Sequence, residues 1–454
     1  MREVDVHAVR CTPRFPDFWP ALRNDCTHRQ TTALAPQSRR GRAEKINIAG
    51  ASLVLAISFP AQADFVEDSH LNLGLRNFYL DRDFKQSDAP KSRVGSWSQG
   101  FDLVFRSGFT EGPVQWGLDA SGQYAYRLDG GGGRGPDAVL PYDDSKGRPA
   151  TDYGRAGVTG KLRFANTEVR IGEHRPTLPV AYTDDSRQLV TTYEGATLES
   201  KDWAGWTLNA GRFWKIATRE SSNREDIYLF GDTPQQSSDG LNFAGARYDF
   251  SPTLNATYYI AQLEDIYRQH YLAAAHTTQF GEGYSLKTDV RYYNTREEGA
   301  RLSGDFDNQA LGLMTALRKG AHTFTVGYQH MSGDDAFPLL NGYAPQPYLV
   351  NWSAVAFYKA GERSWQLRYD YDFVAMGVPG LKFMTRYLRG TDIDRGAGQQ
   401  NNIESERNIY LNYVVQSGPL QGLGFDARNI QVKSRYGADF TENRLITTYT
   451  WKFW

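Results

Sequence analysis

The stretch SWQLRYDYDF, residues 364–373, alternates two kinds of side chain. One set of alternate positions is apolar or aromatic and comprises Trp365, Leu367, Tyr369, Tyr371 and Phe373. The other set is polar and comprises Gln366, Arg368, Asp370 and Asp372. Such a strand fits a soluble sandwich, whose apolar face meets a second sheet, and equally a transmembrane barrel, whose apolar face meets lipid and whose polar face lines a wet interior. The rest of the sequence is needed to distinguish the sandwich from the barrel.

The same alternation recurs along the chain in runs that are long for a soluble strand. Examples are WSQGFDLVFRSGF (97–109), VQWGLDASGQYAY (114–126) and SLKTDVRYY (285–293). Short turn signals such as FANTEV (164–169) alternate with long polar connections such as DGGGGRGPDAVLPYDDSKGRP (129–149). Long strands, short turns at one end and long loops at the other are typical of an outer-membrane β-barrel. The pattern predicts an all-β, antiparallel transmembrane barrel of about 18 strands, with short periplasmic turns and long extracellular loops.

The N-terminal part predicts export. The stretch RRGRAEKINIAGASLVLAISFPAQAD (39–64) has a basic start, a short apolar run and a small-residue exit, which predicts a signal peptide over 39–63 with cleavage before Asp64. Residues 1–38 precede it as an N-terminal extension, to which we assign no function, and residues 64–454 form the predicted barrel domain. Both cysteines, Cys11 and Cys26, lie before the cleavage site, so disulfides cannot stabilise the exported chain.

The last segment, RLITTYTWKFW (444–454), alternates in the same way and ends on aromatic residues. A closed barrel needs its last strand to pair with its first, because an open sheet edge cannot face lipid. We therefore expect this segment to be the closing strand.

Several segments resemble the OprD family of substrate-specific porins of Gram-negative outer membranes. They are LRNFYLDRDF (75–84), LPVAYTDDSRQLVTTYEG (178–195), LEDIYRQHYL (263–272), GYQHMSGDDAFP (327–338) and ERSWQLRYDYDFVAMGVPGLKFMTRYLRGTDID (362–394). The segment RQLV (187–190) departs from the family pattern, which would have a second Leu and a Pro there. The resemblance implies an 18-stranded monomeric or weakly trimeric barrel, narrowed by one inward loop, with a basic row on one wall and acidic groups facing it. It implies small carboxylates as cargo, either aromatic acids or amino acids.

Basic residues recur on the polar parity of successive strands. We expect them to line the channel as a ladder for carboxylates, since arginine is always charged and offers a fixed fork of donors. The ladder comprises Arg76, Arg106, Arg163, Arg170, Arg291, Arg368, Lys382, Arg386, Arg428 and Arg444. They could equally be salt-bridged wall residues. In FDARNIQVKSRY (425–436) the alternation shifts phase, which predicts a bulge near Asn429 that turns Arg428, Lys433 and Arg435 inward.

The stretch RPTLPVAYTDDSRQLVTTYEG (175–195) is the candidate constriction loop. Its prolines stiffen the backbone, and its tip carries both charges and aromatic rings. The residues concerned are Pro176, Pro179, Tyr182, Asp184, Asp185, Arg187 and Tyr193. An acidic wall opposite the ladder is expected from Asp334, Asp335, Asp370 and Asp372.

Other functions find less support in the sequence. An enzyme would need a nucleophile, a base and an orienting group, and no histidine stands beside a serine in a recognisable motif. A general, non-selective porin remains the alternative. We expect no cofactor, metal or nucleic acid, and we expect outer-membrane lipid, lipopolysaccharide and the barrel-assembly machinery as partners. The expected location is the Gram-negative outer membrane.

Overall fold

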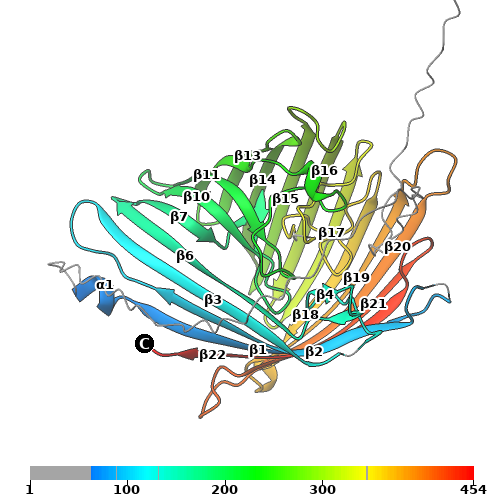
Figure 1. The fold of residues 1–454 in the computed structure, drawn as a ribbon, viewed down its shortest axis with the longest axis horizontal. Coiled ribbons are helices and arrows are strands. Elements are labelled where there is room, and N and C mark those ends of the chain that lie inside the picture. The colour runs from blue at the N-terminus through cyan, green and yellow to red at the C-terminus, as the bar shows by residue number, and fades with distance from the viewer. Residues whose placement is uncertain (1–62, 88, 131, 344–345) are drawn as a thin grey trace, which may run out of the picture. The chain divides into compact units, whose positions relative to one another are not determined.

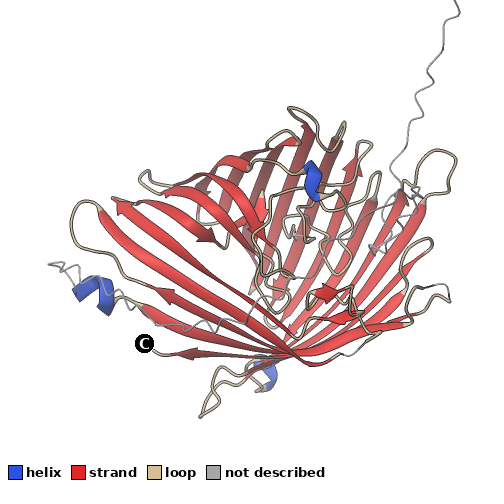
Figure 2. Ribbon diagram, in the orientation of Figure 1, coloured by secondary structure: helices blue, strands red, loops and turns tan. Residues whose placement is uncertain are grey.

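The computed structural model describes residues 63–454 apart from 88, 131 and 344–345. Eighteen strands form one antiparallel sheet in which each strand pairs with the next one along the chain (Figures 1 and 2). The first strand, β1 (His70–Phe84), also pairs with the last, β22 (Phe440–Lys452), with Leu75 opposite Tyr449. This pairing closes the sheet into a barrel without a free edge, as the sequence predicted.

The barrel wall is built from strands whose long alternating segments were recognisable in the sequence. Besides β1 and β22, its strands are β2 (Arg93–Arg106), β3 (Gln115–Asp129), β6 (Asp152–Phe164), β7 (Thr167–His174), β10 (Thr192–Ser200), β11 (Trp206–Ala217), β12 (Leu241–Ser251), β13 (Leu254–Leu263), β14 (Tyr267–Phe280), β15 (Tyr284–Glu297), β16 (Asp307–Lys319), β17 (His322–Ser332), β18 (Arg363–Asp372), β19 (Leu381–Ile393), β20 (Asn402–Val414) and β21 (Gly424–Ser434).

Minor elements lie in the connections. Two small hairpins, β4 (Tyr142–Asp143) with β5 (Arg148–Pro149) and β8 (Thr177–Leu178) with β9 (Ala181–Tyr182), form separate sheets. The helical segments are α1 (Ala63–Glu67) and the 3₁₀ turns η1 (Pro234–Gln236) and η2 (Phe373–Met376). No helix in the described part of the chain is long and apolar enough to cross a membrane.

The two faces of the wall differ as the alternation requires. On β18, Leu367 is 52% exposed on the outer face and lies opposite Val326 of β17, which is 55% exposed. The intervening Gln366 is 2% exposed because it faces inward, where its amide donates to the backbone oxygen of Val350. The outer face is thus the apolar surface that lipid covers, and the polar face lines the interior.

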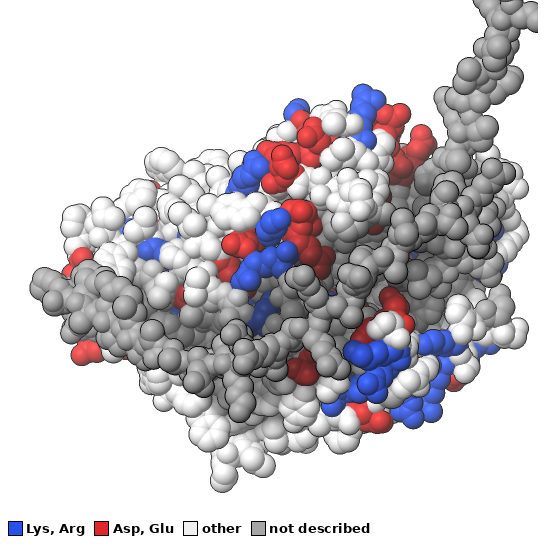
Figure 3. Space-filling view, viewed as in Figure 1, with Lys and Arg blue, Asp and Glu red and all other residues white. Residues whose placement is uncertain are grey.

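The two ends of the barrel also differ. At one end the strands are joined by turns as short as residues 165–166, 252–253 and 320–321. At the other end the connections include 175–191, 218–240 and 333–362. These are the periplasmic and extracellular ends respectively. Figure 3 shows charged side chains gathered over the upper and right-hand parts of the face in view, and few on its left-hand wall.

The interior is filled on one side by more than the one loop that the sequence predicted. Leu229 of loop 218–240 and Leu340 of loop 333–362 form a bridge with each other. Both are buried with inward aromatic residues of the wall, among them Phe213 and Tyr293, and with Val180 of loop 175–191. These loops therefore share one apolar core inside the barrel, which fixes them against the wall.

The bulge predicted near Asn429 is wrong. Strand β21 keeps an unbroken register with both β20 and β22 from Gly424 to Val432. Ile430 and Val432 face inward, where they are buried against Val355 and Phe357 of loop 333–362. Beyond the hydrocarbon layer, apolar side chains face inward and charged ones face outward, which reverses the distribution seen within the membrane. The reason is that inward loops cover the inner face there, while water and headgroups meet the outer face. Lys433 and Arg435 consequently lie on the outward parity and are exposed.

The predicted signal peptide and N-terminal extension lie outside the described residues except for Ala63, and they stay predictions.

Candidate channel site

Five predicted arginines lie on one wall of the interior, on β18, β19, β21, β22 and β1, with β20 between β19 and β21. Arg368 of β18 is directly opposite Arg386 of β19, and Arg428 of β21 is directly opposite Arg444 of β22. Arg76 lies on β1, the neighbour of β22. We call these five residues the arginine row. Like charges at directly opposite positions destabilise a sheet, so such pairs need compensating partners.

Three members of the row have partners on the wall itself. Arg368 binds the carboxylate of Asp370 with two hydrogen bonds, of 2.8 and 2.7 Å. Arg428 binds Asp426 in the same way, with Nε 3.0 Å from Oδ1 and 2.9 Å from Oδ2. Arg444 donates from Nε to Glu442 at 2.5 Å. The carboxylate in each case stands two residues away on the same strand and the same face, so the strand itself fixes its position beside the arginine.

The other two members of the row contact the inward loops. Arg76 donates to the backbone oxygens of Asp185, at 2.6 Å, and of Arg187. Arg386 donates to the backbone oxygen of Trp352 at 3.3 Å and to the hydroxyl of Ser353. The tips of loops 175–191 and 333–362 are therefore placed beside the row.

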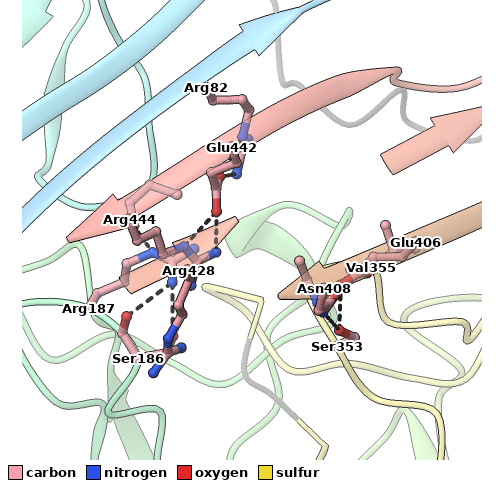
Figure 4. A network of polar contacts seen from close by, with 12 residues as sticks. Arg82, Ser186, Arg187, Ser353, Val355, Glu406, Asn408, Arg428, Glu442 and Arg444 are labelled. Atoms are coloured by element: carbon pink, nitrogen blue, oxygen red, sulfur yellow. Dashed lines mark hydrogen bonds and ion pairs between the residues drawn. The ribbon is translucent and has the colours of Figure 1, made fainter. Parts of the chain in front are cut away.

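A buried polar network anchors the extracellular end of this wall (Figure 4). The fully buried carboxylate of Glu442 accepts hydrogen bonds from Arg82 at 2.7 Å and from Arg444. Arg187, on loop 175–191, donates to the backbone oxygen of Ala138 at 3.0 Å and to Ser186. Burial and the charges of Arg444 and Arg219 lower the pKa of Arg187 well below its usual range.

The other predicted basic residues are spread around the interior. Arg163 donates to Gln115 at 2.7 Å and lies over the ring of Phe109, and Arg291 of β15 donates to the backbone oxygen of Tyr348 at 3.0 Å. Arg170 forms an ion pair with Glu168. Lys382 is 66% exposed and lies 4.0 Å from Asp372 near the periplasmic end. Arg106 ends β2 and is exposed.

The predicted constriction loop does enter the barrel. The backbone oxygen of Pro179 accepts from Tyr293 at 3.0 Å and from Gln346 at 2.6 Å. The hydroxyl of Tyr193 donates to the backbone oxygen of Tyr182 at 3.2 Å. These bonds join the loop to β15, to loop 333–362 and to the start of β10.

A buried ion pair holds the tip of the same loop. Arg219 of loop 218–240 donates to Asp184 at 2.6 Å, and their side chains are 9% and 3% exposed. Burial opposes ionisation of Asp184, but the charges of Arg219 and Arg187 outweigh it, so that the pKa of Asp184 lies below its usual value. Asp185, the next residue, is exposed. The loop thus presents one free carboxylate towards the arginine row while the other is used for structure.

The four predicted acidic residues do not assemble into one wall. Asp370 pairs with Arg368 beside it, and Asp372 accepts from the backbone of Val374 at 3.0 Å in the turn to η2. Asp335 accepts from the backbone of Asp307 at 2.8 Å at the extracellular end of β16, and the adjacent Asp334 is exposed.

The carboxylates that do meet the basic residues include some that the sequence reasoning missed. Asp102 of β2 forms a two-bonded pair with Arg175, at 2.6 and 2.7 Å, and Asp119 of β3 lies 2.6 Å from Lys161.

Gly172 of β7 has φ of +129°, a value that favours glycine, and a Cβ there would clash with the backbone oxygen of Val158.

Further basic residues were also missed. Arg82 and Arg155 share the inward parity with Arg76 and Arg163 on their own strands, so the pattern could have found them. Arg219 and Lys359 lie in loops, where no periodicity marks an inward side chain. Within the described ranges no cluster of three or more His, Cys, Asp or Glu side chains could hold a metal ion.

Comparison with known proteins identifies the family. Residues 63–453 match the model described as outer membrane porin, OprD family. The chain is 38% identical over 405 residues to the porin-like protein GalP of Pseudomonas putida, covering 88% of this chain and 96% of that protein.

Solved structures agree. OpdL of Pseudomonas aeruginosa is 48% identical, with a TM-score of 0.78, and the match covers 86% of this chain and 100% of OpdL. OpdK of the same organism, solved with vanillate, is 36% identical with a TM-score of 0.80 over the same shares of the two chains. The chain therefore belongs to the OprD family of porins, which are channels rather than enzymes and lie in the Gram-negative outer membrane.

Proposed function

We propose that this porin passes small carboxylate-bearing solutes along the arginine row. The observation that carries the proposal is the pairing of Arg368 with Arg386 and of Arg428 with Arg444 at directly opposite positions on neighbouring strands. Three of these four guanidinium groups are each paired with a carboxylate on their own strand, namely Asp370, Asp426 or Glu442. A guanidinium group has five N–H donors, so donors beyond those used in the wall pairs are available to bind a passing carboxylate.

The chemistry of arginine suits such a passage. A guanidinium group can bind a carboxylate with two parallel hydrogen bonds, and it stays charged at any physiological pH. When several such groups stand within reach of one another, a solute can form a new bond before it loses the last. Entry is then favoured without a single deep site that would trap the solute.

The row also has the exposure that a transport site needs. Arg368 and Arg428 are 39% and 28% exposed, whereas Arg444 is 7% exposed and belongs mainly to the buried network with Glu442. Arg76 donates to the backbone oxygens of Asp185 and Arg187, so it lies where the loop tip approaches the wall. Arg368, Arg428 and Arg76 are therefore the members that we expect to touch solute.

Aromatic acids fit the site better than basic amino acids. A basic amino acid would need free carboxylates for its cationic end. Asp370, Asp426 and Asp102 are each bound to an arginine through two hydrogen bonds, which leaves the exposed Asp185 of the loop tip for such a cation. The rings of Tyr182 and Tyr348 lie 6.2 Å apart edge to face and are partly exposed near the loop tip. The related OpdK was solved with vanillate, an aromatic carboxylate.

The test is single-channel recording of the refolded protein in a planar bilayer, with vanillate and arginine added separately. We expect millimolar vanillate either to block the channel or to carry current through it. Free arginine should have the same effect only at higher concentration. A large ohmic conductance that neither solute changes would instead establish a general porin. Block by free arginine but not by vanillate would instead indicate basic amino acids as the solutes.

A further inference from the structure

A second basic site lies on the outer surface of the barrel, apart from the channel. Its members are Arg363, Arg389, Arg407, Lys433 and Arg435, which we call the outer basic patch. They stand on the outward parity of strands β18 to β21 and of the residues that extend β21, near the extracellular end. Their inward neighbours Ser364, Leu388, Glu406 and Val432 are buried, which fixes the orientation of the strands.

The strand register brings the patch together. Arg389 lies opposite Ser405, and Ser405 lies opposite Lys433, so Arg389 and Lys433 are in one row two strand spacings apart, which is about 10 Å. Arg407 is on the strand between them, two residues nearer the membrane centre. These three residues therefore form a triangle on the outer face of the barrel.

The level of the patch corresponds to the lipid headgroups. Trp365 lies opposite Arg389, and Tyr387 lies opposite Arg407. The two rings are on the outer face with centroids 5.6 Å apart, and each is 38% exposed. Tryptophan and tyrosine on the lipid face of a barrel mark the boundary between hydrocarbon and headgroups. The basic groups stand at and just beyond that boundary.

Four of the five basic residues of the patch have no ion-pair partner among the described residues, unlike basic residues on another part of the rim. On the other side of the barrel, outward Arg212 pairs with Glu264, Arg268 with Glu298 and Arg296 with Asp307. In the patch, Arg407 donates to the amide oxygen of Asn429, and Arg363 forms an ion pair with Asp392 at 3.9 Å. Among the described residues, no carboxylate forms an ion pair with Arg389, Lys433 or Arg435.

We infer that the outer basic patch binds the phosphate groups of a phosphorylated glycolipid in the outer leaflet. Arginine binds phosphate through two parallel hydrogen bonds, and lysine adds a compact positive charge. Basic side chains at headgroup level gain affinity for anionic lipids without needing a deep pocket. The adjacent apolar face of Leu367 and Leu411 offers a surface for the acyl chains.

The experiment is native mass spectrometry of the full barrel in detergent with bisphosphorylated lipid A and with its monophosphorylated form. In R389Q/K433Q we expect lipid A affinity to fall at least tenfold, since each basic residue near an anionic surface contributes about a fivefold factor. The matched control is R212Q/R268Q, which removes two outward but ion-paired charges at the same end and should bind lipid A as the parent protein does.

Three outcomes would overturn the inference. They are unchanged lipid A binding by R389Q/K433Q, an equal loss in the control, and equal affinity for the two forms of lipid A. A change of oligomeric state in lipid-free R389Q/K433Q would assign the patch to a second copy of the chain instead. All substituted side chains are on the surface, and heat-dependent gel migration verifies that each variant is folded.

Discussion

Arg368 of β18 and Arg386 of β19 are directly opposite each other on the inner wall, yet each is held by a different part of the molecule. Arg368 is held by Asp370 on its own strand, and Arg386 is held by oxygen atoms of loop 333–362. One member of the pair is therefore set by the wall alone, and the other depends on the loop.

The first prediction concerns the more exposed member. Arg368→Gln removes a charged donor to a passing carboxylate while the strand keeps its pairing. Hydrogen bonds to charged groups contribute about 1.5–3 kcal/mol, so the concentration of vanillate that half-blocks the channel should rise about tenfold or more. Arg268→Gln, outside the barrel in an ion pair with Glu298, is the control and should leave block unchanged. Unchanged block in Arg368→Gln would remove this residue from the pathway.

The second prediction tests the two faces of β18 at adjacent positions. Leu367→Arg places a charge on the outer face and should cost about 2–4 kcal/mol if the position lies near the membrane midplane. Arg368→Ala should leave folding intact and alter conductance. Urea-induced unfolding in lipid vesicles measures the first effect, and planar-bilayer recording measures the second. The reverse pattern would contradict the assignment of faces.

The wall was predictable because one strong physical constraint acts on every strand. Lipid on one side and water on the other impose a period of two, so Leu367 and Arg368 could be assigned to faces from the sequence. In the structure the same parity holds for Arg368, Arg386, Arg428, Arg444 and Arg76, which share the inner face of their strands.

The loops were less predictable because their side chains are placed by contacts distant in sequence. Asp184 and Arg219 are in different loops, and nothing in their local pattern indicates that they pair. The rule of alternation also failed above the lipid, where Ile430 and Val432 face inward under loop 333–362. There the apolar environment is the loop core and not the membrane.

The third prediction concerns the ion pair between Asp184 and Arg219. Arg219→Met leaves a buried carboxylate without its partner, which costs about 3–5 kcal/mol and should displace loop 175–191. Open-channel conductance should rise, and the preference for vanillate over arginine should fall. The double variant D184N/R219M removes both charges and should recover much of the parental behaviour. If the single and double variants conduct alike, the pair does not position the loop.

The same pair should make the loop sensitive to acid. Because the folded-state pKa of Asp184 is lower than its ordinary value, its ionised form stabilises the folded loop. This stabilisation is present above the ordinary pKa of an aspartate and is lost as pH falls through the lowered one. Conductance should therefore resemble that of Arg219→Met only under strongly acidic conditions.

The fourth prediction concerns Asp335, whose effect on stability depends on pH in the opposite direction. Burial raises the pKa of Asp335 from 3.8 to about 6, with a further contribution from the charge of Asp334. Between these two values the folded protein binds more protons at this site than the unfolded one, so stability decreases as pH rises from about 4 to about 6. Thermal unfolding in detergent should show this slope in the parent protein. Asp335→Asn should flatten it, and an unchanged slope would assign the effect to other groups.

The last prediction follows from a short chain of contacts that ends at the arginine row. Glu406 of β20 is fully buried and accepts from the backbone of Val355 at 2.7 Å and of Ala354 at 3.2 Å. It also accepts from the hydroxyl of Ser353, which in turn accepts from Arg386. The carboxylate thus positions both loop 333–362 and a guanidinium group of the row.

Glu406→Gln keeps the shape of the side chain but replaces one acceptor oxygen by an amide that can only donate, so one loop contact must break. We expect a more mobile loop, larger fluctuations of the open-channel current and weaker block by vanillate. Ser353→Ala removes the hydroxyl that links Arg386 to Glu406 but keeps the bonds from the backbone of Ala354 and Val355 to Glu406, so it should weaken block without raising the fluctuations. Glu298→Gln, on the outer rim, is the control for removing a carboxylate. If Glu406→Gln and Glu298→Gln behave alike, Glu406 has no role in placing Arg386.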